Sequence, residues 1–486
     1  MIAIGDYGEF PVSRRSTWAP LALNLCLVLL LASPAYATIS GSAGLDTTNY
    51  VSTAQSSKGV DFSNLRADVL AETTSKTIRA RAQAEFMLGL TKNSTTTGEA
   101  PEIYIGMNPE TFPVQLSLGR KLMPWNVLDN EWGLGIWQPR FRWDVLHPEE
   151  VGMMGAFLEA QSEFVQGAIF ITPFFVPDRG VPIDASNGNI RSSSPWMITP
   201  PNNVFFRGQS IPIAYDLRVP PVEDVVMNGG WSTNLRVGHK SGRGPWVSTS
   251  FSRKPVNQLL LGFFGKMSID ANAPADVVDP IQAKLYPRIL YHELKSFDMG
   301  YSHKRVNLWA SALWEHPIRD ETPATWNTQE ITNSEAYGFG VRWAAVGELD
   351  KRGMEFSLGY LRQVGGDAPS QGPPELNVSN FESRYPFKST LRFGYETPVN
   401  LIMQPISRGH FWEKLRWKMN LTYDFIAEGS IVSTELDYRP SQKWIIRAGV
   451  DILSSSNPDA NTSSASDLIN RYVANDAIYG RVGYVF

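Results

Sequence analysis

The chain has 486 residues, and its 44 Lys and Arg against 48 Asp and Glu give a formal net charge of −4 at pH 7. This slight acidity excludes the broad basic surface of a nucleic-acid-binding protein. The length exceeds that of most single soluble domains, which leaves a multidomain chain or one large barrel. Aromatic residues make up 12% of the chain, a content typical of proteins whose outer face meets lipid headgroups.

The N-terminal segment has the pattern of an export signal. Two arginines at 14–15 precede an apolar run at 19–32, and the small residues Ala35 and Ala37 follow it. Basic, apolar and then small-x-small is the order of a secretory signal peptide, so residues 1–37 are predicted to be removed in the mature chain. A membrane anchor is the alternative, but the apolar run is shorter than the roughly 20 residues that span a bilayer.

The residues after this signal offer no cofactor or metal chemistry. The only cysteine, Cys26, lies within the signal, so the mature chain has no disulfide and no cysteine metal site. The histidines lack metal-binding spacing, and no glycine loop of a phosphate-binding type is present.

Residues 38–59 are rich in Ser and Thr and poor in large apolar side chains. They are predicted to form a flexible periplasmic start.

The clearest structural signal is the alternation of apolar and polar residues at 78–90. Side chains of a strand point alternately to opposite faces, so one face of this segment is apolar and the other is mostly polar. The segment is longer than a typical soluble strand and long enough for a tilted membrane strand of about nine to eleven residues. The apolar face consists of Ile78, Ala80, Ala82, Ala84, Phe86, Leu88 and Leu90.

The same alternation recurs toward the C-terminus. In a lipid barrel the apolar face of each strand points outward and the polar face lines water. Such strands must close into a barrel, because nothing in hydrocarbon can satisfy the hydrogen bonds of an open edge. The later alternating segments lie at 337–343, 354–360, 391–396, 415–425, 444–452 and 476–486.

The strand-like segments are odd in number, whereas bacterial barrels have an even number of strands. The segment at 203–218 is interrupted by Pro212 and is the one to exclude, whereas the segment at 284–294 is kept. The sequence therefore predicts an all-β fold. It is a transmembrane antiparallel β-barrel of about 18 strands, with about 16 as the alternative, and it occupies residues 60–486.

The last strand ends the chain at Phe486, and a terminal Phe on an alternating strand resembles the assembly signal of Gram-negative outer-membrane barrels. Residues 117–121, Ser-Leu-Gly-Arg-Lys, resemble a stretch found in several porin families. Residues 60–486 thus resemble the porin-like barrels, with the alginate-export-type channels as one candidate relative. The resemblance implies a place in the outer membrane, contact with its lipids, insertion by the barrel-assembly machinery through the C-terminal strand, and no cofactor. It also allows a homo-oligomer.

Basic residues recur on the face opposite the lipid-facing side chains. Charged rings set the selectivity of many pores, so these cations predict a lumen that attracts anions. The alternative is that they pair with carboxylates across the lumen and brace the barrel. The predicted pore-lining cations are Arg79, Arg81, Arg342, Arg392, Arg416, Lys418, Arg447 and Arg481. Acidic residues on the same face are Asp68, Glu72, Glu85, Glu355, Asp424, Glu435, Asp437 and Asp451.

A cluster of indoles at 125–143 is a candidate aromatic constriction that could stack on sugar rings. The alternatives are an aromatic belt at the membrane interface and a loop packed into the barrel. The cluster consists of Trp125, Trp132, Trp137 and Trp143.

These features favour a passive channel for small polar or anionic solutes or saccharides, with no catalytic residues. Two alternatives remain open. One is a barrel enzyme acting on lipid, for which His292 and His303 lie near Ser296 and Ser302 in the sequence; serine catalysis would need a hydroxyl within hydrogen-bond reach of a histidine. The other is a plugged structural or adhesive barrel whose loops bind a partner.

Overall fold

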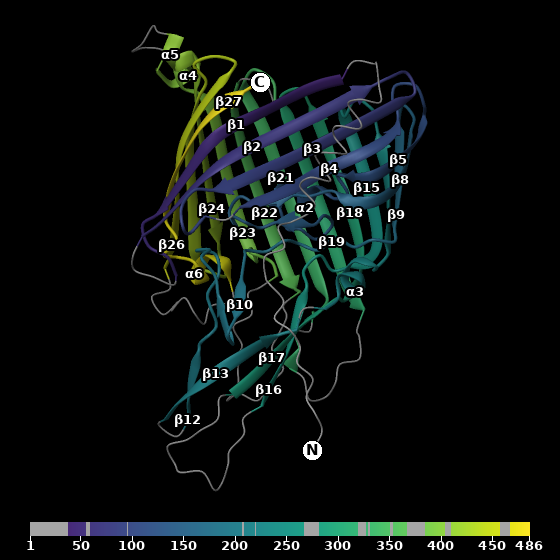
Figure 1. The fold of residues 1–486 in the computed structure, drawn as a ribbon. Coiled ribbons are helices and arrows are strands. Elements are labelled where there is room, and N and C mark those ends of the chain that lie inside the picture. The colour runs from purple at the N-terminus through teal and green to yellow at the C-terminus, as the bar shows by residue number, and fades with distance from the viewer. Residues whose placement is uncertain are drawn as a thin grey trace.

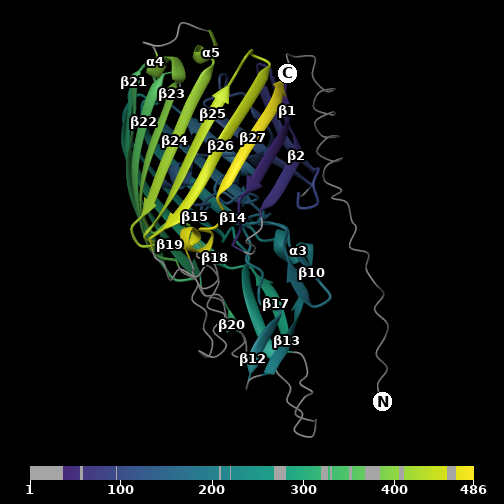
Figure 2. The ribbon, with the colours of Figure 1, turned by 90° about the vertical axis from the view of Figure 1, so that its left-hand side faces the viewer.

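The computed structural model describes residues 37–54, 59–94, 96–206, 209–218, 220–266, 281–318, 327–328, 331–349, 353–366, 384–403, 410–456 and 467–486. The predicted signal peptide at 1–37 lies outside this range except for Ala37. Within it, a single antiparallel sheet of 18 strands closes on itself, which confirms the predicted fold class and strand number. Figures 1 and 2 show the barrel from two sides.

The barrel strands follow one another around the wall in chain order. They are β1 (Ala37–Tyr50), β2 (Val60–Thr74), β3 (Ile78–Gly89), β4 (Thr97–Met107), β5 (Val114–Lys121), β8 (Met153–Gln161), β9 (Val165–Thr172), β14 (Gly230–Gly238), β15 (Gly244–Pro255), β18 (Tyr291–His303), β19 (Val306–Ile318), β21 (Ser334–Val346), β22 (Met354–Gly365), β23 (Ser389–Pro398), β24 (Leu415–Asp424), β25 (Gly429–Tyr438), β26 (Trp444–Ser455) and β27 (Ala477–Val485).

The barrel closes where β1 pairs with the last strand, β27. Their register runs from Ser42 opposite Val485 to Tyr50 opposite Ala477. The backbones of Gly41 and Phe486 exchange two further hydrogen bonds of 3.0 Å. The prediction of a flexible start at 38–59 is therefore wrong for β1. Small and hydroxylated residues give this strand a weak apolar face, but its backbone pairs on both sides and supplies the eighteenth strand.

A second prediction also needs correction. The segment at 284–294 is not one barrel strand: β17 (Ile281–Arg288) belongs to a separate sheet, and β18 begins at Tyr291. The excluded segment at 203–218 lies in the same separate sheet. The sheet contains β12 (Asn203–Phe206), β13 (Gln209–Leu217), β17, β16 (Leu260–Lys266) and β20 (Asn327–Thr328) in that order, and it projects beyond one end of the barrel (Figure 1).

The two ends of the barrel differ. At one end, here called the short-turn end, most connections are brief, such as residues 304–305 and 162–164, and β1 begins and β27 finishes there. The helices α4 (Val399–Met403) and α5 (His410–Glu413) also lie at this end (Figure 1). The opposite, long-loop end carries the connections at 122–152, 173–229 and 256–290.

The remaining helices are α2 (Val127–Trp132), α3 (Val222–Val226) and α6 (Leu468–Arg471). Among the described residues, no helix is both long and apolar enough to cross a membrane.

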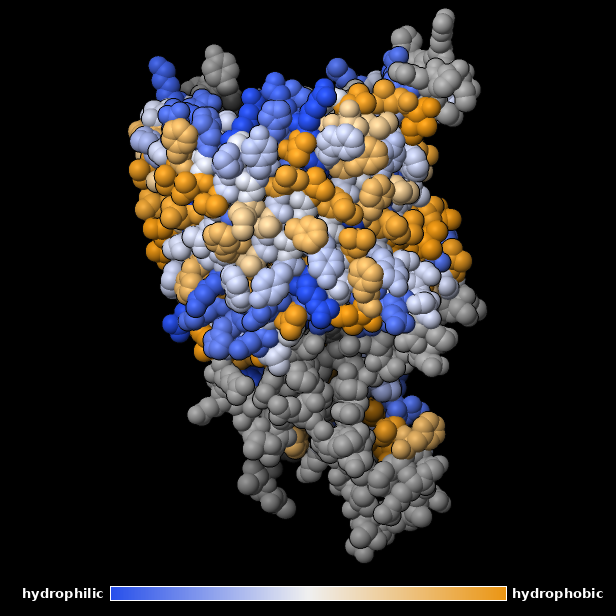
Figure 3. Space-filling model, turned by 180° about the vertical axis from the view of Figure 1, so that it is seen from behind, coloured by the Kyte–Doolittle hydropathy of each residue, from blue (hydrophilic) through white to orange (hydrophobic). Residues whose placement is uncertain are grey.

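The alternation read from the sequence gives the wall an apolar outer face. Leu65, Leu88 and Ile105, on neighbouring strands, point outward and are 46%, 50% and 44% exposed. In Figure 3, hydrophobic side chains gather around the middle of the wall, whereas hydrophilic ones predominate near its two rims. Such a band matches the apolar belt that membrane barrels present to lipid.

Gly44 lies at the seam between β1 and β27, where the two strands leave no room for a side chain. A Cβ atom on Gly44 would lie 2.6 Å from the carbonyl oxygen of Val482 across the seam, whereas one on Gly480 would meet no atom closer than 3.5 Å. We expect Gly44→Ala to destabilise the barrel by about 1–3 kcal/mol and Gly480→Ala to have little effect. The heat-induced shift in electrophoretic mobility measures this, and equal midpoints for the two variants would contradict it.

Candidate functional site: the barrel lumen

The connection at 122–152, here called the inward loop, folds into the barrel. Its helix α2 begins after Asn126, whose side-chain oxygen accepts a hydrogen bond of 2.8 Å from the backbone of Asp129. Gly133 ends the helix in a left-handed conformation with φ of 64°, as helix C-caps often do. The Asp129 carboxylate then accepts hydrogen bonds from the backbones of Ile136 and Trp137, so one buried side chain holds the loop compact.

The inward loop is anchored on one wall of the barrel. The amide of Asn126 donates to Asp298 of β18 at 2.7 Å and to Ser311 of β19 at 3.0 Å. Ser250 of β15 donates to the carbonyl of Trp125. These side chains are buried, so the contacts satisfy polar groups that would otherwise be costly inside the barrel.

The same loop crosses to the other side of the lumen. Trp132 lies 4.3 Å from the Arg392 guanidinium of β23. Further along, Glu149 forms an ion pair of 2.6 Å with Arg66 of β2, and His147 contacts Asp144 at 3.0 Å. The loop therefore narrows the lumen between walls that are far apart in the strand order.

The four predicted tryptophans all belong to this loop, and three of them are buried within the barrel. Trp125, Trp132 and Trp137 are only 1%, 4% and 1% exposed. Trp125 and Trp137 stack with their ring centres 6.0 Å apart, and Trp143 meets the edge of Phe62 on β2. Of the interpretations weighed from the sequence, the packed loop describes the placement of these indoles best.

A second segment, Ser193–Trp196 of the connection at 173–229, reaches across the long-loop end, and sequence reasoning missed it. Trp196 donates to the Tyr50 hydroxyl at 3.1 Å, and Tyr472 donates to the Trp196 carbonyl at 2.8 Å. Both partners are buried aromatic residues near the β1–β27 seam. No periodic pattern marks Trp196, because it lies in an irregular connection whose partners are distant in sequence.

The lumen has one covered and one accessible wall. On β8 to β19 the inward residues beside the inward loop are buried, including Phe157, Phe170, Ser232, Ser252, Leu294 and Leu313. On the wall from β22 through β27 to β1–β3, inward side chains keep contact with solvent: Lys418 is 38% exposed, Arg447 32% and Arg81 28%. This second wall, which keeps solvent-accessible inward charges although the inward loop touches it at Arg392 and Arg66, is here called the charged wall.

Every predicted pore-lining cation faces inward on, or next to, the charged wall, but nearly all of them are paired. The pairs are Arg79 with Glu72 (2.6 Å), Arg81 with Glu102 (2.8 Å), Arg342 with Glu355 (3.3 Å), Arg416 with Glu396 (2.6 Å), Lys418 with Glu435 (3.6 Å), Arg447 with Asp437 (3.2 Å) and Arg481 with Asp68 (2.9 Å). Arg392 instead donates to the carbonyl of Glu131 at 3.0 Å and lies over Trp132. The sequence prediction omits Arg66, although it lies on the same face as Asp68.

The residues considered for serine catalysis do not assemble within the described part of the chain. His292 is buried and contacts Glu315 at 2.5 Å through Nδ1, while its Nε2 has no hydrogen-bond partner there. Ser302 instead donates to Asn307. Glu315 also holds Arg384 and Tyr385, so the cluster ties these two residues to the wall. Across the described ranges, no group of three or more His, Cys, Asp or Glu side chains could hold a metal ion.

No protein-family model and no curated protein matches the sequence. Solved structures with a similar overall shape include OmpT of Vibrio cholerae, described as an outer membrane protein in its trimer form. It has 7% identity and a TM-score of 0.39, and the match covers 93% of this chain and 99% of that one. OmpF of Salmonella typhi, in complex with daunomycin, has 10% identity, coverage of 93% and 97%, and a TM-score of 0.38. OpdQ of Pseudomonas aeruginosa has 11% identity, coverage of 93% and 96%, and a TM-score of 0.44.

The closed antiparallel barrel of 18 strands, with its apolar outer belt and its polar lumen, defines the class of the protein. It is a closed antiparallel β-barrel of the membrane-spanning kind.

Asn126 is the residue whose loss should loosen the inward loop most directly. Asn126→Ala removes the helix cap and leaves Asp298 with fewer hydrogen bonds, so we expect a loss of about 1–3 kcal/mol. Asn126→Asp keeps a capping oxygen but places a carboxylate against Asp298, and it should be at least as damaging. Urea unfolding of the refolded protein measures both. A wild-type midpoint for Asn126→Asp would show that the contact to Asp298 does not hold the loop.

His147 gives the inward loop a pH dependence. Burial acts to lower its pKa, but the Asp144 carboxylate, with a further contribution from Asp451, raises the pKa of His147 from 6.5 to about 9. The contact therefore stabilises fully below about pH 6.5 and is lost as the pH rises through about 9. We expect the stability difference between wild type and His147→Gln, measured by urea unfolding, to shrink between about pH 6 and about pH 10. An unchanged difference would contradict the ion pair.

Proposed function

We propose that the protein is a passive channel for small polar solutes across the outer membrane, and not an enzyme. One observation carries the proposal: the inward loop is anchored on β15 to β19 and touches the charged wall only in places, so that the side chains of Lys418, Arg447 and Arg81 stay 38%, 32% and 28% exposed. A water-filled path beside paired charges needs neither a cofactor nor a moving plug. The polar side chains along such a path would form hydrogen bonds with a passing solute and so replace the water molecules that the solute loses.

The proposed orientation follows from the lengths of the connections. Outer-membrane barrels have short periplasmic turns and longer extracellular loops. The short-turn end would therefore face the periplasm, and the projecting sheet of β12, β13, β16, β17 and β20 would face outward from the cell. Export by residues 1–37 and insertion through the strand that ends at Phe486 agree with this location, and outer-membrane lipids would surround the apolar belt. The same proposal includes association into a homo-oligomer.

The pairing of charges bears on the proposed solutes. A cation that already contacts a carboxylate offers a passing anion less net attraction than a free one. Arg392 contacts the Glu131 carbonyl and the rings of Trp132 and Phe387, and we propose it as the inward cation that attracts anions most, although the Glu131 carboxylate acts on it as well. We therefore propose small polar solutes with a weak preference for anions. The three buried indoles offer little exposed ring face on which a saccharide could slide.

A plugged barrel is the second candidate, because a specific observation favours it. Buried apolar residues from the inward loop, the Trp196 segment and both walls form one connected cluster inside the barrel. If this cluster seals the whole cross-section, the projecting loops would be the functional surface.

Conductance of the refolded protein in planar bilayers separates the two candidates. The channel should give steady conductance, and under a salt gradient a reversal potential with a slight anion preference. Lys418→Glu should move that potential toward cations, because Lys418 faces the passage, whereas Arg362→Glu, on the outer face of β22, should not. A heat-modifiable, folded barrel without conductance would overturn the channel and leave the plugged barrel.

A further inference from the structure

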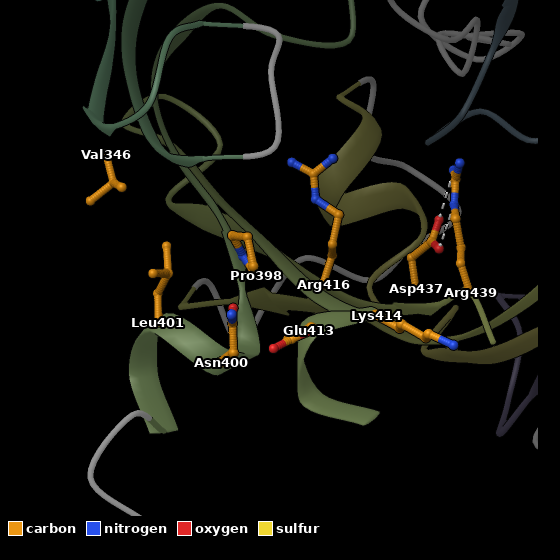
Figure 4. A pocket seen from close by; sticks show the side chains of 9 residues that line it. All are labelled: Val346, Pro398, Asn400, Leu401, Glu413, Lys414, Arg416, Asp437 and Arg439. Carbon is orange, nitrogen blue, oxygen red and sulfur yellow. Dashed lines mark hydrogen bonds and ion pairs between the residues drawn. The ribbon is translucent and has the colours of Figure 1, made fainter. Parts of the chain in front are cut away.

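Nearly all cations inside the barrel are held by carboxylates of the protein. The cavity of about 280 Å³ at the short-turn end, between α4, α5 and the wall, is an example. In its lining, which Figure 4 shows, Arg439 pairs with Asp437 at 3.1 Å, and Arg416 pairs with Glu396 at 2.6 Å. A cation held in this way attracts a further anion less than a free one does. A site for an anion therefore requires cations that the protein itself leaves unpaired.

Two cations on the outer face of the wall meet this requirement. Arg253 lies near the end of β15 and Lys295 near the start of β18, and both are exposed. Their sequence neighbours Ser252 and Leu294 are buried on the inward face, so the two cations point away from the lumen. Within the described part of the chain, neither cation forms an ion pair with a carboxylate.

The two cations lie close enough to act on one group. Arg253 is opposite Glu293 of β18, and Lys295 follows two positions later on the same face. Side chains at such diagonal positions of neighbouring strands begin about 7–8 Å apart, so both can reach a ligand between them. The Glu293 carboxylate offsets one of the two positive charges, and His316 of β19 lies on its other side. We call Arg253, Glu293 and Lys295 the outer patch.

Aromatic rings surround the outer patch. The Lys295 ammonium lies 5.8 Å from the ring centre of Phe251, its cross-strand neighbour on β15. On the other side, Trp314 of β19 is opposite Lys295 and is 38% exposed. Trp231 of β14 is opposite Arg253, and its ring centre lies 5.2 Å from that of Phe251. Tryptophan gathers where the hydrocarbon of a bilayer meets its headgroups, so these rings place the outer patch at that height.

The apolar belt begins directly beside the outer patch. The next two outward side chains along β18, Phe297 and Met299, are 43% and 48% exposed. A charged side chain inside hydrocarbon is costly, so Arg253 and Lys295 mark the edge of the belt. The anions that meet the wall at this height are the phosphate groups of lipid headgroups.

We propose that the outer patch binds the phosphate group of a membrane lipid whose acyl chains lie against Phe297 and Met299. Arg253 and Lys295 would donate charge-assisted hydrogen bonds to the phosphate. The acyl chains would hold the phosphate beside the two cations, whereas salt in water would screen their attraction for a free phosphate ion. The inference goes beyond the proposed channel, because it concerns the outer face of the wall and does not depend on conduction.

Native mass spectrometry of the refolded full barrel in detergent tests this, with dioleoyl phosphatidate as the probe. Wild type should retain phosphatidate saturably and should not retain dioleoyl glycerol, which lacks the phosphate. Arg253→Gln and Lys295→Gln should each weaken binding about fivefold, the effect expected for one cation near a charged bilayer surface. Glu293→Gln should strengthen binding, because it removes the opposing charge. Lys240→Gln, which removes a positive charge at the short-turn end, should bind as wild type does.

The outcomes separate the lipid from other occupants. Inorganic phosphate at the same concentration should not displace phosphatidate, and displacement would overturn the proposal in favour of a site for a soluble anion. The proposal is equally overturned if the two cation variants retain phosphatidate as well as Lys240→Gln does. A changed oligomeric state with unchanged lipid binding would assign the face to contacts between copies of the chain. A barrel that binds phosphatidate but does not conduct would keep this site and reject the channel.

Discussion

The structure depends on one constraint: a backbone N–H or C=O group that faces hydrocarbon must find its hydrogen-bond partner within the protein. This requirement explains why β1, with its small and polar residues, is nevertheless a strand. Without it, β2 and β27 would each present an open edge to lipid. The pairing of β1 on both sides removes both edges at once. Closure therefore decides the secondary structure of residues whose own side chains would not predict it.

Closure with 18 strands also leaves a wide interior that must be filled or hydrated. A lumen of this size is too large for wall side chains alone to fill. The inward loop and the Trp196 segment occupy part of it, and they form a hydrophobic core inside a barrel whose outer face is also apolar. Because such a core must satisfy its own polar groups, Asn126 meets Asp298 and Ser311, and Asp129 caps the turn that follows α2. The charged wall keeps charged side chains that are accessible to solvent.

Local pattern predicted the parts of this arrangement that repeat. The alternation at 78–90 and the C-terminal strand ending at Phe486 gave the fold class, and the inward face of the cations followed from the same period. The sequence pattern could not predict which residues far apart in the chain contact each other. Asn126 and Asp298 are separated by 172 positions, and Trp196 and Tyr472 by 276. The prediction of a barrel strand at 284–294 was wrong because a strand of the projecting sheet has the same local sequence pattern as a barrel strand.

The same limit explains why the charged face looked simpler in the sequence than it is. Spacing places Arg447 and Arg481 on the inward face but does not say which carboxylate each will meet. In the barrel, Asp437 joins Arg439 to Arg447, Arg481 lies opposite Arg447, and Asp68 joins Arg481 to Arg66, which reaches Glu149 of the inward loop. Cations and carboxylates thus follow one another from Arg439 at the short-turn end to the inward loop, with one adjacent pair of cations, Arg447 and Arg481. Conduction requires sites that attract a solute yet release it. A guanidinium that is paired with a carboxylate of the wall can both bind and release a passing anion. It can exchange the carboxylate for the anion and then return to the carboxylate, so it always has an ion-pair partner.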